Sequence, residues 1–330
     1  MTIINRKIFL VIIIVLLYVP CVNAQDFNVT GFADAYYAYD NDNSGSSLRQ
    51  FSAVAPIRDQ FRINLAQVTG TYSTEKVRGV VILQFGDIPY YNWPQSPNQY
   101  LQYIQEANVG FQPIKNLWFD MGYFLTHIGA EGIIPINNNF SSLALATYFE
   151  PFYQSGIRVN YTFSDKAYGS LYLLNGYNVF ADNNKNLSGA MQVGFKPQKN
   201  IELIYNNIVG NEQPSGNKGK TRFFNNLVLK YSPFEKLDLL LGFDYAIQQD
   251  SKLSDSLSAA DLYGGLFSVK YKFASKFSAM LRLETFGDKN GILSGTCMNT
   301  DSVLTGLKAG GISIGIEHKP VDNGYLRITF

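Results

Sequence analysis

Apolar and polar residues alternate with a period of two along most of the chain after residue 25. Within 236–248, one set of alternate positions carries Leu237, Leu239, Leu241, Phe243, Tyr245 and Ile247, whereas the other carries Asp238, Gly242, Asp244 and Ala246. Successive side chains of a β-strand point to opposite faces. The pattern therefore predicts a strand with one apolar face and one wet face, and segments 263–273 and 276–284 repeat it.

The alternation predicts fifteen strands, each bounded by a turn or a polar connection. They are expected near residues 27–39, 61–72, 77–86, 104–112, 117–125, 150–163, 167–178, 188–197, 200–209, 221–232, 236–248, 262–273, 276–287, 307–319 and 324–330. Short turns such as 113–116 alternate with long polar connections such as 87–103. This rhythm is typical of an outer-membrane barrel with short periplasmic turns and long extracellular loops. A secreted β-sandwich is the soluble alternative, but its strands are shorter and its turns more closely spaced.

Two structures satisfy every backbone polar group within lipid: an α-helix and a closed β-barrel. After residue 25 no apolar run is long enough for a spanning helix. The sequence therefore predicts an all-β protein, an antiparallel transmembrane β-barrel with long extracellular loops over residues 25–330. A closed bacterial barrel has an even number of strands, so a complete barrel of about 16 strands is expected. We expect either that a final returning strand is missing or that the strand count is wrong by one.

Residues 1–24 have the pattern of a secretory signal peptide. Arg6 and Lys7 precede an apolar run over 8–17, and Val22-Asn23-Ala24 forms a small-residue cleavage site before Gln25. The run is shorter than a spanning helix requires. We therefore expect an exported protein of the bacterial outer membrane. Its mature chain keeps only Cys297, so no intramolecular disulfide is expected.

Three segments carry a family resemblance: LRQFSAVAPIRDQFRINLAQV at 48–68, GVVILQFGDIP at 79–89 and FLTHIGAEG at 124–132. They resemble the Putative beta-barrel porin-2, OmpL-like family of outer-membrane proteins. The resemblance implies a porin-like barrel in the outer membrane of a Gram-negative bacterium. It implies no particular solute and assigns no role to an individual residue.

Composition narrows the expected partners. The formal net charge is +1 and 16% of residues are charged, which gives no reason to expect nucleic acid. The mean hydropathy of −0.06 is that of a soluble protein, yet a barrel has the same average because its lipid-facing and lumen-facing residues cancel. Outer-membrane lipid and small hydrophilic solutes are the expected partners, with no cofactor. A homo-oligomer stays open, because no interface pattern is evident.

The parity of the strands predicts which charged side chains line the lumen. The candidate pore-lining residues are Arg62, Arg78, Glu106, Asp120, Glu131, Arg158, Lys230, Asp244, Lys270, Arg282 and Glu284. The same parity adds Lys272 and Arg327 to the cations, and Glu202, Asp238 and Glu317 to the carboxylates. Rings of one sign would indicate ion selectivity. The signs nearly balance, so we expect either a weakly selective pore or neutralisation between neighbouring strands.

The connection 126–149 is the candidate for a constriction. It is the third long connection, which folds inward in porins of known type, and it carries His127, Glu131 and the apolar segment SSLALATYF. If it folds inward, we expect Glu131 to face Arg62, Arg78 or Arg158 and to set a transverse field across the pore. An ordinary external loop is the alternative.

Passive or weakly selective diffusion of small hydrophilic solutes is the function that these features favour. The alternative is a plugged barrel whose extracellular loops bind a ligand or a surface. The aromatic cluster Tyr90, Tyr91, Trp93 and Tyr100 could serve such binding, although packing within the loop is the simpler interpretation. An enzyme is not expected, because no nucleophile or carboxylate signature surrounds His127 or His318.

Overall fold

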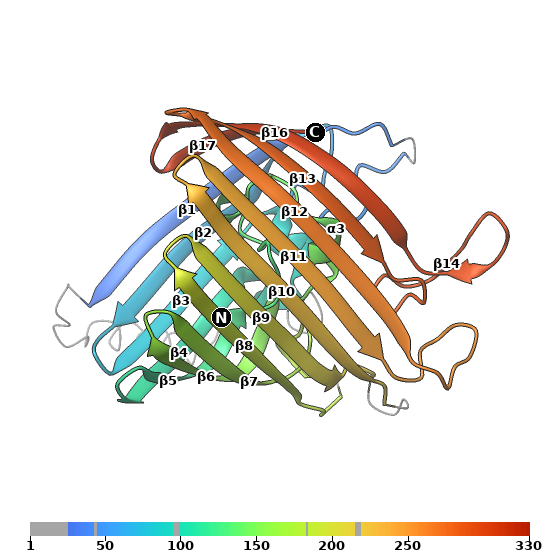
Figure 1. Cartoon of the computed structure of the whole chain (residues 1–330), viewed down its shortest axis with the longest axis horizontal. Helices are drawn as coiled ribbons and strands as arrows, with labels where there is room; N and C mark the ends of the chain where they lie inside the picture. The colour runs from blue at the N-terminus through green and yellow to red at the C-terminus, as the bar shows by residue number, and fades with distance from the viewer. Residues whose placement is uncertain (1–25, 43–44, 95–98, 183, 215–218) are drawn as a thin grey trace, which may run out of the picture.

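One antiparallel sheet forms nearly the whole described molecule. The computed structural model describes residues 26–42, 45–94, 99–182, 184–214 and 219–330, so the predicted signal peptide at 1–24 lies outside it. Fifteen strands follow one another in sequence order around the sheet, each bonded to its neighbours in the chain. Figure 1 shows the sheet curving from β1, in blue, round to β17, in red. The predicted all-β antiparallel architecture is confirmed.

The large sheet consists of β1 (Phe27–Tyr37), β2 (Phe61–Ser73), β3 (Val77–Phe85), β4 (Ile104–Ile114), β5 (Leu117–Leu125), β6 (Tyr153–Ser164), β7 (Ala167–Leu174), β8 (Ser188–Gln198), β9 (Ile201–Asn211), β10 (Thr221–Phe234), β11 (Leu237–Gln248), β12 (Ala260–Ala274), β13 (Phe277–Gly287), β16 (Lys308–Val321) and β17 (Gly324–Thr329). All fifteen predicted strands are present. The connections contain α2 (Asp87–Asn92), η1 (Gln99–Tyr103), η2 (Pro135–Asn137), α3 (Leu145–Phe149) and a small hairpin of β14 (Cys297–Met298) and β15 (Leu304–Thr305). The alternation pattern did not predict these short elements.

Four strands run two residues or fewer past the ends expected from sequence, and each passes through a proline. β4, β8, β10 and β16 continue beyond Pro113, Pro197, Pro233 and Pro320. A proline cannot donate a ladder hydrogen bond, so it is tolerated in a strand at a bulge or an edge. The register shifts at each of these places, for example between Phe111 and Ile114 and between His318 and Val321. The prolines therefore mark bulges at the ends of strands.

The two faces of the sheet differ as the alternation predicted. In β11 the side chains of Leu241, Phe243 and Tyr245 are exposed on the outside, while those of Asp244 and Ala246, at the alternate positions, are buried on the inside. An apolar outer face suits lipid and a polar inner face suits a lumen. Among the described residues, no helix is long and apolar enough to cross a membrane.

The first and last strands of the sheet each have one bonded neighbour. β1 pairs with β2, and β17 pairs with β16. A side-chain contact joins the two ends, since the hydroxyl of Tyr325 on β17 donates to Oδ1 of Asp34 on β1 at 2.7 Å. The absence of a final returning strand stays a prediction.

Two glycines face each other where β5 and β6 come close to their neighbours. Gly122 and Gly156 are register partners, with φ of 136° and 150°. A Cβ on Gly122 would lie 2.2 Å from the carbonyl oxygen of Ala107, and one on Gly156 would lie 2.0 Å from that of Leu173. Both positions therefore require glycine, for its backbone freedom and for its missing side chain.

We expect Gly156→Ala to lower the free energy of unfolding by about 1–3 kcal/mol, because the backbone must leave a conformation that alanine strains. Denaturant unfolding of the refolded protein in detergent measures the change. Gly189→Ala is the matched control, because its Cβ would meet only Val209, at 3.9 Å. Equal losses in the two variants would contradict the assignment of strain to Gly156.

Candidate functional site

The connection between β5 and β6 folds into the interior of the curved sheet. Its backbone and side chains bond to strands on distant parts of the wall. The contacts are His127 Nε2 with the carbonyl oxygen of Asn207 on β9 at 3.0 Å, Gly129 N with Oδ1 of Asn226 on β10 at 3.2 Å, Asn139 Nδ2 with Oγ of Ser268 on β12 at 3.0 Å, Leu145 N with Oε2 of Glu284 on β13 at 2.7 Å, and Nη1 of Arg327 on β17 with the carbonyl oxygen of Pro135 at 2.7 Å. An external loop could not reach these inward-facing partners. The expectation of an inward fold is therefore confirmed.

Arg282 on β13 is the centre of this attachment. Its guanidinium lies 3.3 Å from Oε1 of Glu131, donates to the carbonyl oxygen of Ser142 at 2.8 Å and covers the ring of Phe140 at 4.8 Å. Glu131 in turn accepts from the backbone N–H of Ala144 at 2.7 Å. Both members of the ion pair are buried. Arg282 thus attaches two separate parts of the connection, at Glu131 and at Ser142, to the wall.

The predicted partner of Glu131 was wrong. Glu131 faces Arg282 and not Arg62, Arg78 or Arg158, because those arginines have carboxylate partners of their own. Arg62 pairs with Asp87 at 2.6 Å, and Arg78 and Arg158 pair with Asp120 at 2.5 and 3.1 Å. Glu131 therefore does not set the expected transverse field with those arginines, since its ion pair with Arg282 is buried.

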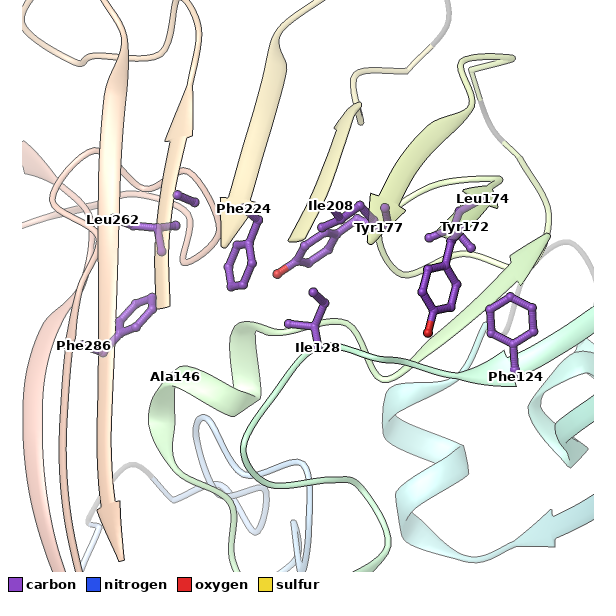
Figure 2. Packing of buried hydrophobic residues seen from close by; sticks show 12 residues of the cluster. Phe124, Ile128, Ala146, Tyr172, Leu174, Tyr177, Ile208, Phe224, Leu262 and Phe286 are labelled. Atoms are coloured by element: carbon purple, nitrogen blue, oxygen red, sulfur yellow. The ribbon is translucent and has the colours of Figure 1, made fainter. Parts of the chain in front are cut away.

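An apolar cluster fills the space between this connection and the wall. Inward-facing Phe124, Tyr172, Leu174, Ile208, Phe224, Ala246, Leu262 and Phe286 gather with Ile128 and Ala146 of the connection. Figure 2 shows the strand side chains converging on Ile128 and on the helical turn that carries Ala146. Burial of apolar side chains contributes about 1.5–3 kcal/mol each. The cluster therefore holds α3 against β12 and β13 in addition to the polar contacts.

A second apolar cluster joins the long connections to one another. Val54 of the first connection, Ile88 and Trp93 of the second, Ile133 of the inward one and Phe180 of the next pack together. The Trp93 ring lies 4.8 Å from that of Tyr153. Tyr90, Tyr91 and Tyr100 are exposed instead. The predicted aromatic cluster is therefore divided, with Trp93 in the packed interior.

The predicted pore-lining residues separate into two groups. Asp120, Glu131, Asp244 and Arg282 are buried and hold neighbouring groups in place. Arg62, Arg78, Glu106, Arg158, Lys230, Lys270 and Glu284 keep part of their surface accessible. Lys270 pairs with Glu317 at 2.6 Å, and Lys230 lies 3.8 Å from Glu202. The structure therefore places part of the predicted set in a packed interior and part along an accessible wall.

Several contributing residues were missed from sequence. Lys196 and Lys319 lie within the strands predicted at 188–197 and 307–319, each next to a proline near the end of β8 or β16, but they were not included among the lumen cations. Strand parity could have placed both lysines on the inner face. Asp87 lies in a connection, and Glu150 also lies in one because β6 begins at Tyr153 and not at the predicted residue 150, so strand parity applies to neither. They become site residues only through the folding of those connections.

Glu150 forms a buried carboxyl pair with Asp244 at the end of the inward connection. Oε2 of Glu150 is buried and accepts no hydrogen bond from the described residues, and a hydrogen bond between Glu150 and Asp244 requires a proton between the two carboxyl groups. Burial and the neighbouring carboxylates of Asp244 and Glu131 raise the pKa of Glu150 well above its ordinary value. The neutral acid is therefore the form that fits this place.

The two histidines serve in packing. The His127 ring stacks on Tyr172 at 4.2 Å and contacts Gln154 Oε1 at 3.0 Å through Nδ1. His318 stacks on Phe277 at 4.4 Å. Among the described residues, the hydrogen-bond partners of His127 are Gln154 and Asn207, and neither is a nucleophile.

A family model described as Putative beta-barrel porin-2, OmpL-like matches residues 26–330, which is nearly the whole chain. The chain belongs to this family. No curated protein matches the sequence.

Solved outer-membrane channels share the architecture. The outer membrane channel DcaP of Acinetobacter baumannii has a TM-score of 0.58 at 12% identity, over 93% of this chain and 91% of that one. The anion-selective porin from Comamonas acidovorans has a TM-score of 0.56 at 10% identity, over 90% of this chain and 86% of that one. OmpF of Salmonella typhi, in complex with daunomycin, has a TM-score of 0.53 at 10% identity, over 90% of this chain and 87% of that one. These likenesses show the fold.

The family and the barrel fold make the protein a porin-like channel of the Gram-negative outer membrane. They indicate a channel rather than an enzyme. The inward connection lies within this porin-like barrel, and its attachments to the wall can be tested by substitution.

We expect Glu131→Gln to reduce the free energy of unfolding by about 3 kcal/mol, because Arg282 would keep its charge in a buried place without a carboxylate. Thermal and denaturant unfolding measure the loss, and protease cleavage within 132–144 reports release of the connection. Glu75→Gln, in an exposed periplasmic turn, is the control and should change neither. Unfolding curves that superimpose for the two variants would refute the role given to the ion pair.

The attachment of the connection should weaken as the pH rises. A carboxyl group whose pKa is raised on folding contributes its full stability below its ordinary pKa of 4.5, and that contribution is lost as the pH rises through the folded value. Asp244 and Glu131 are the charged neighbours that oppose ionisation of Glu150.

Glu150→Gln should remove this dependence, since an amide cannot ionise. Protease protection of the connection, followed from neutral to alkaline pH, measures the effect. Glu235→Gln, an exposed substitution in a periplasmic turn, should keep the wild-type profile. A Glu150→Gln profile as steep as that of the wild type would show that another group titrates.

Proposed function

We propose that small hydrophilic solutes diffuse passively through the lumen, past the inward-folded connection 126–152. The observation that carries the proposal is the set of bonds from this connection to β9, β10, β12, β13 and β17, which reach the wall across the interior. A segment fixed in this way narrows the passage without depending on a moving part. The width of the remaining passage then sets the size of solute that can cross.

A cavity of about 380 Å³ beside the connection supports this function. Its lining includes Asn138, Tyr168, Gln192, Asn206 and Lys230. Amide, hydroxyl and ammonium groups of this kind can replace the water molecules that a hydrophilic solute leaves behind. The adjoining cavity of about 170 Å³ also includes Lys230 in its lining and continues to Lys196 and Lys199 at the periplasmic end. These two cavities give a polar route along β7 to β10.

A plugged barrel whose extracellular connections bind a ligand is the second candidate. The two apolar clusters favour it, because they pack the connections against the wall and against one another. Tyr90, Tyr91 and Tyr100 add exposed aromatic surface on the extracellular side. Exposed rings of this kind can stack on a ligand. Open conductance belongs to the diffusion channel and not to the plugged barrel.

Single-channel recording of the refolded protein in a planar bilayer tests the function. We expect stable conductance steps, and we expect liposomes containing the protein to admit small neutral sugars and to exclude larger ones. Glu131→Gln should enlarge the steps and raise the size limit, because it loosens the constriction. Glu75→Gln should leave both unchanged. A barrel shown to be folded by circular dichroism that neither conducts nor admits sugars would overturn the proposal in favour of the plugged barrel.

A homo-oligomer, which is common among porins, also stays a prediction. The mass of the protein–detergent complex measured by light scattering would decide it.

A further inference from the structure

Carboxylates and cations of the lumen wall differ in their access to water. The Asp120 side chain is 0% exposed, whereas Arg78 and Arg158, which flank it, are 34% and 25% exposed. Asn160 also donates to Asp120, at 2.6 Å. The carboxylate is thus covered by its own donors, and the surface that faces the lumen at this place is cationic.

The same arrangement recurs on another part of the wall, at β8 to β10. Glu202 is 20% exposed and lies 3.1 Å from Lys196 and 3.8 Å from Lys230, which are 47% and 53% exposed. Tyr168 covers the carboxylate further by donating to Oε1 at 3.1 Å. Lys199 joins the two lysines in lining the cavity beside them.

Two further carboxylates follow this pattern. Glu317 is buried between Lys270 and Arg327, with the more exposed Lys319 at 4.0 Å. Asp87 is buried beneath the partly exposed Arg62. In each of the four groups, the carboxylate is less exposed than at least one of the cations that pair with it.

Exposed carboxylates interrupt the pattern at the end of the barrel where β11 begins. Asp238 lies at the periplasmic end of β11, opposite Lys270 in register, and accepts from Ser232 at 2.6 Å. The cavity beside it is also lined by the exposed Glu235 and Asp322 and by five lysines, so lysines outnumber exposed carboxylates there by five to three. The five are Lys236, Lys270, Lys272, Lys276 and Lys319. Glu284 faces the connection and accepts a hydrogen bond from the backbone N–H of Leu145 at 2.7 Å.

We propose that the lumen prefers small hydrophilic anions, such as carboxylate-bearing or phosphate-bearing solutes. The inference deepens the proposed function and rests on it for transport, while the sign of the lumen field can be measured separately. Since the cations of these four groups each lie beside a covered carboxylate, they attract an anion without holding it by a full unpaired charge. Weak attraction at successive places favours passage over retention. The two principal places are Arg78 with Arg158 on one wall and Lys196 with Lys230 on another.

A cysteine reporter measures the sign of the field directly. Cys297, exposed in the β14–β15 hairpin, is the free cysteine among the described residues. Cys297→Ser removes it, and Asn200→Cys then places a thiol in the cavity lined by Lys196, Lys199 and Lys230. The modification rates with a negatively charged and a positively charged methanethiosulfonate reagent are compared, with the native Cys297 of the unaltered protein as the reference site.

We expect the negative reagent to react faster than the positive one by roughly tenfold relative to Cys297 at low salt. The preference should shrink at 1 M salt, where the screening length is about 3 Å. Lys196→Gln combined with Lys230→Gln should abolish it, whereas Lys252→Gln in an extracellular connection should not. Equal rates, or a faster positive reagent, would overturn the inference whether or not the barrel conducts.

The zero-current potential across a potassium chloride gradient gives the second readout. An anion preference that the Lys196→Gln and Lys230→Gln pair reduces supports the inference, and a cation preference contradicts it. A folded barrel that does not conduct contradicts the proposed diffusion function instead, and the reagent ratio then still decides the sign of the lumen field.

Discussion

The backbone hydrogen bond is the constraint on which the rest of this structure depends. In lipid an unpaired N–H or C=O costs several kcal/mol, so strands cross only when each is bonded to its neighbours. The fifteen sequential antiparallel strands meet this demand along the sheet. Once the outer face must be apolar, the alternation of side chains directs charged and amide groups inward. The lumen chemistry is thus a consequence of how the wall is built.

A wall lined with polar side chains provides bonding partners for a segment that enters the lumen. The inward connection uses side-chain and backbone groups of Asn207, Asn226, Ser268 and Glu284 as acceptors and adds the buried ion pair with Arg282. Burying such a pair has a desolvation penalty comparable to its attraction, so its main effect is to specify position. Apolar packing around Ile128 and Ala146 supplies the hydrophobic stabilisation. Position and stability therefore come from different residues of the same segment.

The sequence predicted the wall far better than its contents. A period of two can be followed within one strand, so all fifteen strands and their faces were predictable, and the inward Asp244 and Arg282 with them. The prolines misplaced strand ends, because a bulge lets a strand continue through a residue that usually stops it. The partner of Glu131 was not predictable. It depends on where an aperiodic connection of more than twenty residues crosses the barrel, which is decided by contacts with β13 and β17 far away in the chain.

The lumen charges show why a list of residues does not determine a field. Counted by parity, cations and carboxylates nearly cancel, which indicated a weakly selective pore. Carboxylates are short acceptors that several donors can surround, whereas arginine and lysine have long stems that carry the charge away from the backbone. Asp120 and Glu202 are accordingly covered by the cations that pair with them. A solute in the lumen can hydrogen-bond to the exposed cation but not to the covered carboxylate. Equal numbers of opposite charges can therefore present one sign to the channel.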